Sequence, residues 1–232
     1  MRREPRAKGD IALTPARRVG LIIAPLLILV TVYFVVGFTI DQFGFDPGYL
    51  LGIAFYWVVW CIAFPLWAVG RRGLVAMFRG EGGWSIKPSV LGWVLLAIPV
   101  VFMLVTILPQ VWPHLTASIV LLSILIGLVN GTLEEVLWRG TYLVAFPQNR
   151  WMGLIYPAIG FSLWHLAPYA QTTDPTLLEY AMVVVGGLIF GLCWGYVAWR
   201  TRTIRWSVYS HIAANIASMA AITFIIQDVV TL

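Results

Sequence analysis

The chain has 232 residues, of which 60% are hydrophobic and only 11% are charged. Soluble domains carry about 25% charged residues, so this composition excludes an ordinary soluble protein and indicates a polytopic membrane protein surrounded by the lipid bilayer. The formal net charge of +5 does not indicate a nucleic-acid partner, because the basic residues fall in segments that flank apolar runs.

The first 18 residues form a basic segment, and an apolar run at 19–40 follows it. The apolar part of a signal peptide is about 7–15 residues long, so this run is too long for one. No small-x-small cleavage site follows the run. We therefore expect a retained first span behind a basic cytoplasmic segment at 1–18.

Seven runs are long enough to cross a bilayer, since a helical span needs about 20 mostly apolar residues. They lie at 19–40, 48–69, 90–109, 116–137, 152–170, 177–199 and 205–226. The fourth run stays apolar to about residue 146, so an eighth element is expected either there or in the basic 71–88 loop. The sequence therefore predicts an all-α transmembrane bundle of about seven to eight spans.

The basic residues indicate the orientation of the bundle. All 15 Lys and Arg lie in or at the edge of the segments 1–18, 70–89, 138–151 and 200–204. Together, the alternating segments 41–47, 110–115, 171–176 and 227–232 contain four Asp and no Lys or Arg. Cytoplasmic loops are enriched in Lys and Arg, so we expect a multi-pass protein of the cell membrane with its N-terminus in the cytoplasm.

Small residues predict close helix contacts within the bundle. They recur at every fourth position in two spans: Gly127 and Gly131, then Gly187, Gly191 and Gly195. This spacing lets helix backbones approach closely. The two cysteines, Cys61 and Cys193, lie in apolar runs, and we interpret them as small buried hydrophobes.

The fourth span contains the charged residues Glu134, Glu135 and Arg139. A charge at the bilayer centre costs about 2.5–3.5 kcal/mol on insertion scales. Glu135 and Arg139 have i,i+4 spacing with the acid first, which favours an ion pair. Glu134 points about 100° away around the helix and has no such partner, so it is the candidate general base. The alternative is a charged helix end at the interface, with Arg139 reaching the headgroups.

Two further spans carry polar residues. His165 follows Phe161 by four positions in the fifth span, and His211 precedes Asn215 by four positions in the seventh. Residues at i,i+4 share one helix face, so His211 and Asn215 suit a pair of donors to an oxyanion. Alternatively, these side chains hold helices together by hydrogen bonds.

Other catalytic motifs are absent from the sequence. It contains neither a His-Glu-x-x-His zinc motif nor a Gly-x-Ser-x-Gly nucleophile elbow. Ser162 and Ser210 lie beside the histidines, which makes a serine nucleophile a weaker alternative. His114, in a short loop, is expected to have no function.

Three motifs together resemble those of a known family. Glu134-Glu135-x-x-x-Arg139, Phe161-x-x-x-His165 and His211-x-x-x-Asn215 occur in the order found in the CAAX-protease and bacteriocin-processing intramembrane peptidases. This family, also called CPBP or Abi, includes the Ras-converting CAAX endoprotease. The resemblance covers 116–226, which we expect to be the catalytic transmembrane core, preceded by variable transmembrane helices at 19–115.

The resemblance implies a glutamate-dependent endopeptidase that acts near the cytoplasmic leaflet. Its implied roles are base for Glu134, water activation for His165, oxyanion stabilisation for His211 and Asn215, and support from Glu135, Arg139 and Phe161. Members have long been labelled metalloproteases, but we expect no cofactor. If a divalent metal such as zinc is present, its ligands are expected to be Glu134, His165 and His211.

The implied substrate is a membrane-associated or prenylated peptide or protein. The main alternative is a non-catalytic membrane scaffold or chaperone of the same fold. A transporter that relays protons through the acid pair and the histidines is a weaker alternative, because the sequence has no inverted repeat.

The charge pattern makes a testable prediction about topology. Reporter fusions after Asp46, Leu115 and Asp174 should report the outside, and fusions after Arg79 and Arg202 should report the cytoplasm, because Lys and Arg are retained there. A cytoplasmic C-terminus would contradict the predicted number of spans.

Overall fold

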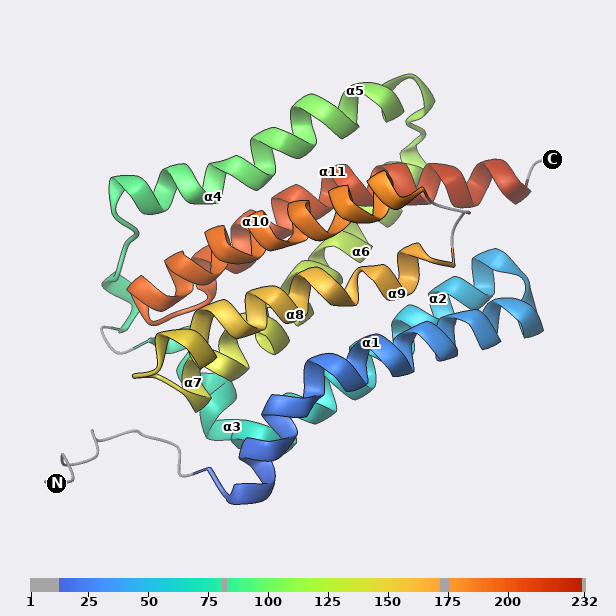
Figure 1. Cartoon of the computed structure of the whole chain (residues 1–232). Helices are drawn as coiled ribbons and strands as arrows, with labels where there is room; N and C mark the ends of the chain where they lie inside the picture. The colour runs from blue at the N-terminus through green and yellow to red at the C-terminus, as the bar shows by residue number, and fades with distance from the viewer. Residues whose placement is uncertain (1–12, 81–82, 172–175, 231–232) are drawn as a thin grey trace, which may run out of the picture.

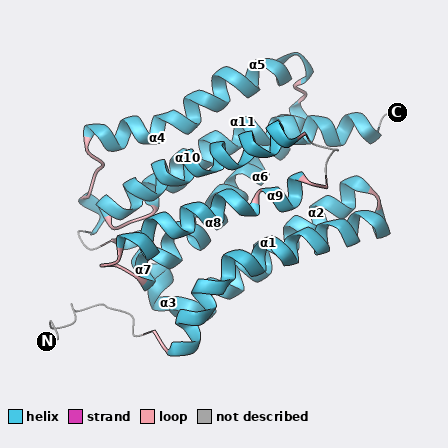
Figure 2. Cartoon of the chain, in the orientation of Figure 1, coloured by secondary structure: helices cyan, strands magenta, loops and turns pink. Residues whose placement is uncertain are grey.

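The computed structural model describes residues 13–80, 83–171 and 176–230. Over these residues the chain is almost entirely helical and contains no strand (Figure 2). This confirms the predicted all-α fold class.

The helices follow the predicted spans in chain order (Figure 1). The bounds are as follows: α1 Pro15–Phe43; α2 Phe45–Phe55, the π-helical η1 Tyr56–Ala63 and α3 Phe64–Arg79; α4 Val90–Phe102, η3 Met103–Ile107 and α5 Leu108–Val111; α6 Ala117–Glu135, η5 Val136–Thr141 and α7 Tyr142–Ala145; η6 Trp151–Ile155, α8 Tyr156–Trp164 and α9 Leu166–Tyr169; α10 Leu177–Thr201; and α11 Arg205–Val230. Short 3-10 turns occur at Gly83–Ser85 and Trp112–His114.

Among the described residues, five helical stretches are long and apolar enough to cross a membrane: Pro15–Phe43, Phe45–Arg79, Val90–His114, Ala117–Ala145 and Leu177–Thr201. The predicted span 152–170 is instead divided into η6, α8 and α9, with a break at His165. The predicted span 205–226 lies within α11. The fourth run is helical as far as Ala145, as its apolar character predicted.

The additional element expected in the 71–88 loop is the second half of α3. This helix is kinked at Gly70, whose φ of 68° lies in the left-handed region that favours glycine. Beyond the kink, Thr203 donates a hydrogen bond to the Phe78 carbonyl at 2.8 Å, and the Ile204 amide donates to the Met77 carbonyl at 2.9 Å. These bonds attach the end of α3 to the connection between α10 and α11.

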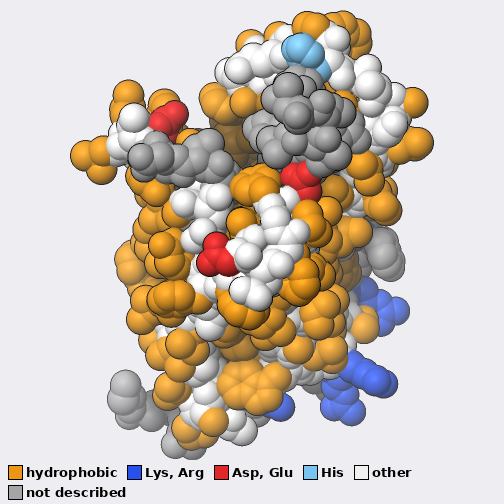
Figure 3. Space-filling model, turned by 90° about the vertical axis from the view of Figure 1, so that its right-hand side faces the viewer, with side chains coloured by type: hydrophobic (Ala, Val, Ile, Leu, Met, Phe, Trp, Pro, Cys, Tyr) orange, Lys and Arg blue, Asp and Glu red, His pale blue; other side chains and the backbone are white. Residues whose placement is uncertain are grey.

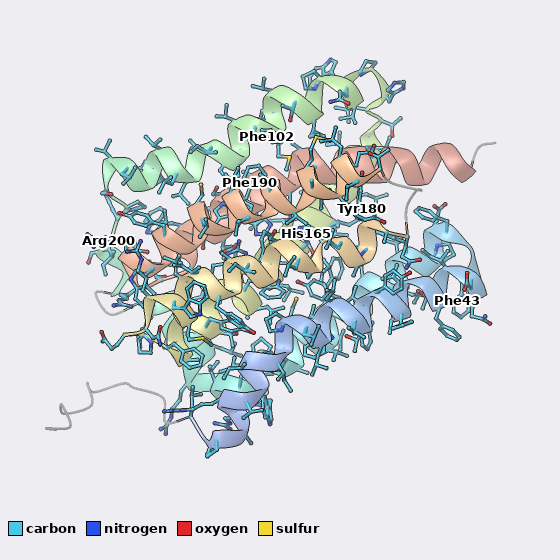
Figure 4. The ribbon with its side chains drawn as sticks, viewed as in Figure 1. Phe43, Phe102, His165, Tyr180, Phe190 and Arg200 are labelled. Carbon is cyan, nitrogen blue, oxygen red and sulfur yellow. The ribbon has the colours of Figure 1, made fainter. Side chains whose placement is uncertain are left out.

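Charged side chains distinguish the two ends of the bundle. The basic end carries every described Lys and Arg except the buried Arg139: Arg17, Arg18, Arg71, Arg72, Arg79, Lys87, Arg150, Arg200, Arg202 and Arg205. The described acidic side chains at the opposite end are Asp41, Asp46 and Glu179. Figure 3 faces this opposite end, with acidic groups on the face and Lys and Arg towards the lower right. Figure 4 labels Arg200 at the basic end and Phe43 at the opposite one.

Glycines set the closest helix contacts in the core. A Cβ atom added at Gly131 of α6 would lie 2.9 Å from the backbone nitrogen of Ile212 in α11, and one at Gly127 would lie 3.1 Å from that of Ile216. On α10, a Cβ at Gly187 would lie 3.1 Å from the Cα of Ser162 in α8. Small residues therefore bring α6 to α11 and α8 to α10, as the spacing predicted.

The contact at Gly131 makes a stability prediction. We expect Gly131→Ala to lower the thermal unfolding midpoint in detergent, because overpacking against a backbone costs about 1–3 kcal/mol. Gly186→Ala is the matched control, since a Cβ there meets nothing within 4 Å. It should leave the midpoint unchanged or raise it, because alanine favours helix. Equal midpoints for the two variants would contradict the close contact of α6 with α11.

Candidate active site

The predicted catalytic side chains converge on one cavity in the bundle. The cavity has a volume of about 480 Å³, and Glu134, His165, His211 and Asn215 all line it. Glu134 comes from α6, His165 from the break between α8 and α9, and the other two from α11. Figure 4 shows His165 near the middle of the bundle, between its two ends.

Glu135 and Arg139 form a buried ion pair beneath this cavity. Arg139 Nη1 lies 3.0 Å from Glu135 Oε1, and the two side chains are only 3% and 0% exposed. The same carboxylate oxygen lies 2.9 Å from His211 Nδ1. Glu135 therefore holds both the arginine and the imidazole, which agrees with the orienting pair predicted from the i,i+4 spacing.

Two aromatic rings enclose the Arg139 guanidinium. Its Cζ lies 4.0 Å from the ring centroid of Phe161 and 5.2 Å from that of Trp194. A cation over an aromatic face is stabilised by the ring quadrupole. Arg139 thus points into the protein, and the alternative in which it reaches the headgroups is wrong. Phe161 therefore contacts Arg139 directly, as a residue that supports the site would.

The residues around Arg139 form the π-helical turn η5, which follows Glu135 directly. In a π-helix each backbone amide bonds to the carbonyl five residues earlier. The Thr141 side chain makes a bond of the same span, because its Oγ1 donates to the Val136 carbonyl at 2.8 Å. π-Helical turns inside α-helices are frequent at functional sites.

Glu134 has a separate set of partners. Its Oε2 lies 3.4 Å from His211 Nε2, and its Oε1 accepts a hydrogen bond from the Tyr56 hydroxyl at 3.3 Å. Tyr56 in turn accepts one from Trp138 Nε1 at 2.8 Å, and its ring stacks on Trp164 with centroids 4.1 Å apart. Tyr56 was not predicted, because a tyrosine on a distant apolar span gives no sequence signal.

His211 lies between Glu134 and Glu135, and this arrangement limits where the protons of the three groups can be. If Nδ1–H donates to Glu135, then either Nε2 or Glu134 must carry a second proton, since two bare acceptors 3.4 Å apart would repel. Both ring nitrogens are therefore engaged. The role of His211 as a donor to an oxyanion stays a prediction, and the structure places its two nitrogens beside Glu134 and Glu135.

His165 lines the cavity, and one of its two ring nitrogens, Nδ1, is engaged by the backbone. Its Nδ1 lies 2.6 Å from the carbonyl oxygen of Phe161. A carbonyl only accepts, so Nδ1 carries the hydrogen and Nε2 keeps its lone pair. The Phe161 ring also packs edge-on against His165, with centroids 4.6 Å apart. Phe161 therefore orients His165 through both its backbone and its ring.

Two donors in the cavity wall lack partners. Asn215 Nδ2 and Trp164 Nε1 are buried and make no hydrogen bond within the described part of the chain. An unsatisfied buried donor costs about 1–3 kcal/mol, so such groups call for an explanation. Asn215 was predicted to be a donor to an oxyanion, and Trp164 is an additional residue of this kind.

The two serines beside the histidines are tied to backbone carbonyls. Ser162 Oγ donates to the Val184 carbonyl at 2.5 Å, and Ser210 Oγ donates to that of Leu96 at 2.6 Å. Ser210 also accepts a hydrogen bond from Trp194 Nε1 at 2.9 Å. Their hydroxyls connect helices, which leaves the serine nucleophile without support.

In the described part of the chain, the predicted metal ligands are not gathered into a coordination cluster. The described residues contain no group of three or more His, Cys, Asp or Glu side chains placed to hold an ion. His211 directs its nitrogens at two different carboxylates, and His165 Nδ1 faces a carbonyl. Glu134, His165 and His211 therefore do not form a common coordination centre in this structure.

The cavity extends from the acid pair towards one end of the bundle. The predicted span boundary at residue 137 placed the acid pair near the basic end, and action near the cytoplasmic leaflet stays a prediction. The helical run continues to Ala145, and its last residues are packed in the core. The cavity lining extends from Glu134 towards the opposite end, as far as Tyr49 and Pro168.

The fold and the site define a multi-pass helical membrane protein with a buried centre of carboxylates and imidazoles. Residues 115–217 match the family model described as Type II CAAX prenyl endopeptidase Rce1-like. This segment is therefore similar to an Rce1-like domain, and the match supports a CAAX-type intramembrane protease. The matched residues contain all three motifs. No curated protein and no solved structure matches the chain.

The buried ion pair makes a stability prediction. Arg139→Ala should lower the free energy of unfolding by about 3–5 kcal/mol, because it leaves Glu135 as a buried charge without its cation. Arg150→Ala, at an exposed position, is the control and should change little. The measurement is chemical unfolding in detergent. Equal stability of the two variants would contradict the structural role of the pair.

Proposed function

We propose that this protein is an intramembrane endopeptidase in which Glu134 activates the attacking water. The observation that supports the proposal is that the two adjacent glutamates have different partners. Glu135 is committed to Arg139 and His211, whereas Glu134 borders the cavity that also contains His165 and Asn215. A general base needs a lone pair that is available to accept a proton from the reacting water, and Glu134 borders the cavity where such a water would lie.

The proposed first step forms a tetrahedral intermediate. A water between Glu134 and the free Nε2 of His165 loses a proton to Glu134, and its oxygen attacks the carbonyl carbon of the peptide bond. The negative charge that develops on the carbonyl oxygen is met by N–H donors in the wall. Asn215 Nδ2 is the donor that the sequence predicted, and its lack of a partner leaves it available.

The second step breaks the carbon–nitrogen bond. The proton held by Glu134 passes to the departing amine, and the intermediate collapses to a new carboxylate and a new amino group. His211 shares a proton with Glu134 and steadies this transfer, while Glu135 and Arg139 hold the imidazole in position. All the required protons come from the attacking water, so the sequence of steps balances without a further reactant.

The proposed reaction uses no metal ion, because base and donor are both protein side chains. Cleavage should therefore persist after treatment with a chelator. The substrate we propose is a membrane-associated peptide or protein, as expected for a CAAX-type protease within a bilayer. We also propose that the protein resides in the cell membrane with its basic end in the cytoplasm.

The role of Glu134 is testable by one isosteric change. Glu134→Gln should abolish cleavage of a reporter membrane peptide while the thermal unfolding midpoint stays close to that of the wild type, because glutamine keeps the shape and loses the basicity. Glu179→Gln makes the same change at the surface end of α10 and should retain activity.

Glu135→Gln separates a catalytic effect from a structural one. It should lower stability, because it removes the anion that Arg139 and His211 face. Full activity of Glu134→Gln would contradict the assignment of the base. Absence of cleavage by the wild type with every substrate would favour the scaffold alternative.

A further inference from the structure

The cavity extends towards one end of the bundle only. Its wall includes Tyr49 near the start of α2, Pro168 near the end of α9 and Met182 near the start of α10. In Figure 1, these ends of α2, α9 and α10 lie on the right, opposite the connection between α10 and α11, which contains Arg202. Along α10 the lining runs from Met182 to Trp194, which is about 18 Å at 1.5 Å per residue.

The basic end is closed by packed side chains. The layer between the site and that end consists of fully buried residues: Met77, Leu137, Trp138, Tyr142 and Ile204. None of them lines the cavity. The packing is tight, since a Cβ added at Gly140 would lie 2.4 Å from the sulfur of Met77. A peptide approaching from the basic end would therefore have to displace the core.

The walls of the cavity are apolar and its polar groups lie deep. Leu50, Ile53, Phe102, Met103, Ile126 and Phe190 contribute to the wall. Exposed apolar residues at its margin include Leu50 and Met182, which are 43% and 58% exposed. Such a wall suits an apolar segment of a peptide, with its backbone meeting the polar groups at the inner end.

The charge pattern identifies the side of the membrane. The basic end carries every described Lys and Arg that is not buried in the core, whereas the described charged groups at the opposite end are acidic. Lys and Arg are retained in the cytoplasm, which places the opposite end outside.

We propose that the substrate reaches Glu134 from the extracytoplasmic side of the membrane, as an apolar peptide segment at or within the outer leaflet. This inference rests on the proposed function for the nature of the ligand. A peptide that approaches from the cytoplasm would meet the closed, basic end of the bundle.

Cysteine accessibility tests the direction of access without requiring catalysis. The full-length chain carries Cys61→Ala and Cys193→Ala to remove its own two thiols, which are buried. Single cysteines are then introduced by Gly186→Cys on α10 and Ser218→Cys on α11, both in the cavity wall. The space beside Gly186 is open, so the new side chain fits. Ser85→Cys, at an exposed position of the basic end, is the matched control.

The probe is a membrane-impermeant maleimide applied to intact cells and to permeabilised cells. We expect Gly186→Cys and Ser218→Cys to be labelled equally in both, and Ser85→Cys to be labelled only after permeabilisation. Labelling of the two cavity positions only after permeabilisation, or in neither preparation, would overturn the inference. The reverse result for Ser85→Cys would overturn it as well.

The outcomes also distinguish this inference from the proposed function. If the cavity positions are labelled from outside but the protein cleaves no peptide, the direction of access is supported and the proposed peptidase activity is contradicted. If cleavage depends on Glu134 but the cavity positions are labelled from the cytoplasm alone, the peptidase activity is supported and access from outside is contradicted.

Discussion

The buried ion pair between Glu135 and Arg139 is the constraint on which the rest of the site depends. Two charges in an apolar bundle lose their hydration, and removing either partner leaves a costly uncompensated charge. The structure meets this demand with a short pair, two aromatic faces over the guanidinium and the imidazole of His211 on the same carboxylate oxygen. Glu135 is thus held by Arg139 and His211, whereas its neighbour Glu134 faces the cavity, with His211 and the Tyr56 hydroxyl among its close partners.

Close packing brings the separate motifs together. Gly131 lies one turn before Glu135 on α6, and its lack of a side chain lets α11 approach until His211 reaches both glutamates. Gly187 has the same effect between α10 and α8, and it lies beside the break that holds His165. The chemistry therefore depends on residues that carry no functional group, because backbone approach sets the distance between the polar side chains.

Local spacing predicted much of this arrangement, and tertiary packing decided the rest. The i,i+4 pair of Glu135 and Arg139 and the contacts at the glycines follow from helix geometry, so the sequence was sufficient for them. Tyr56 was missed, because its contact with Glu134 joins spans far apart in the chain. The depth of Glu134 along its helix could not be predicted, because the fourth run continues to Ala145 and its last residues are packed inside the protein.

The central claim is that Glu134 delivers water directly to a peptide bond. A single turnover in water enriched in oxygen-18, analysed by mass spectrometry of the products and of the digested enzyme, tests it most directly. The account predicts one labelled oxygen in the new carboxyl terminus of the substrate and none in the side chain of Glu134. Label in the Glu134 carboxylate would show that this group attacks the substrate itself, and that result would contradict the account.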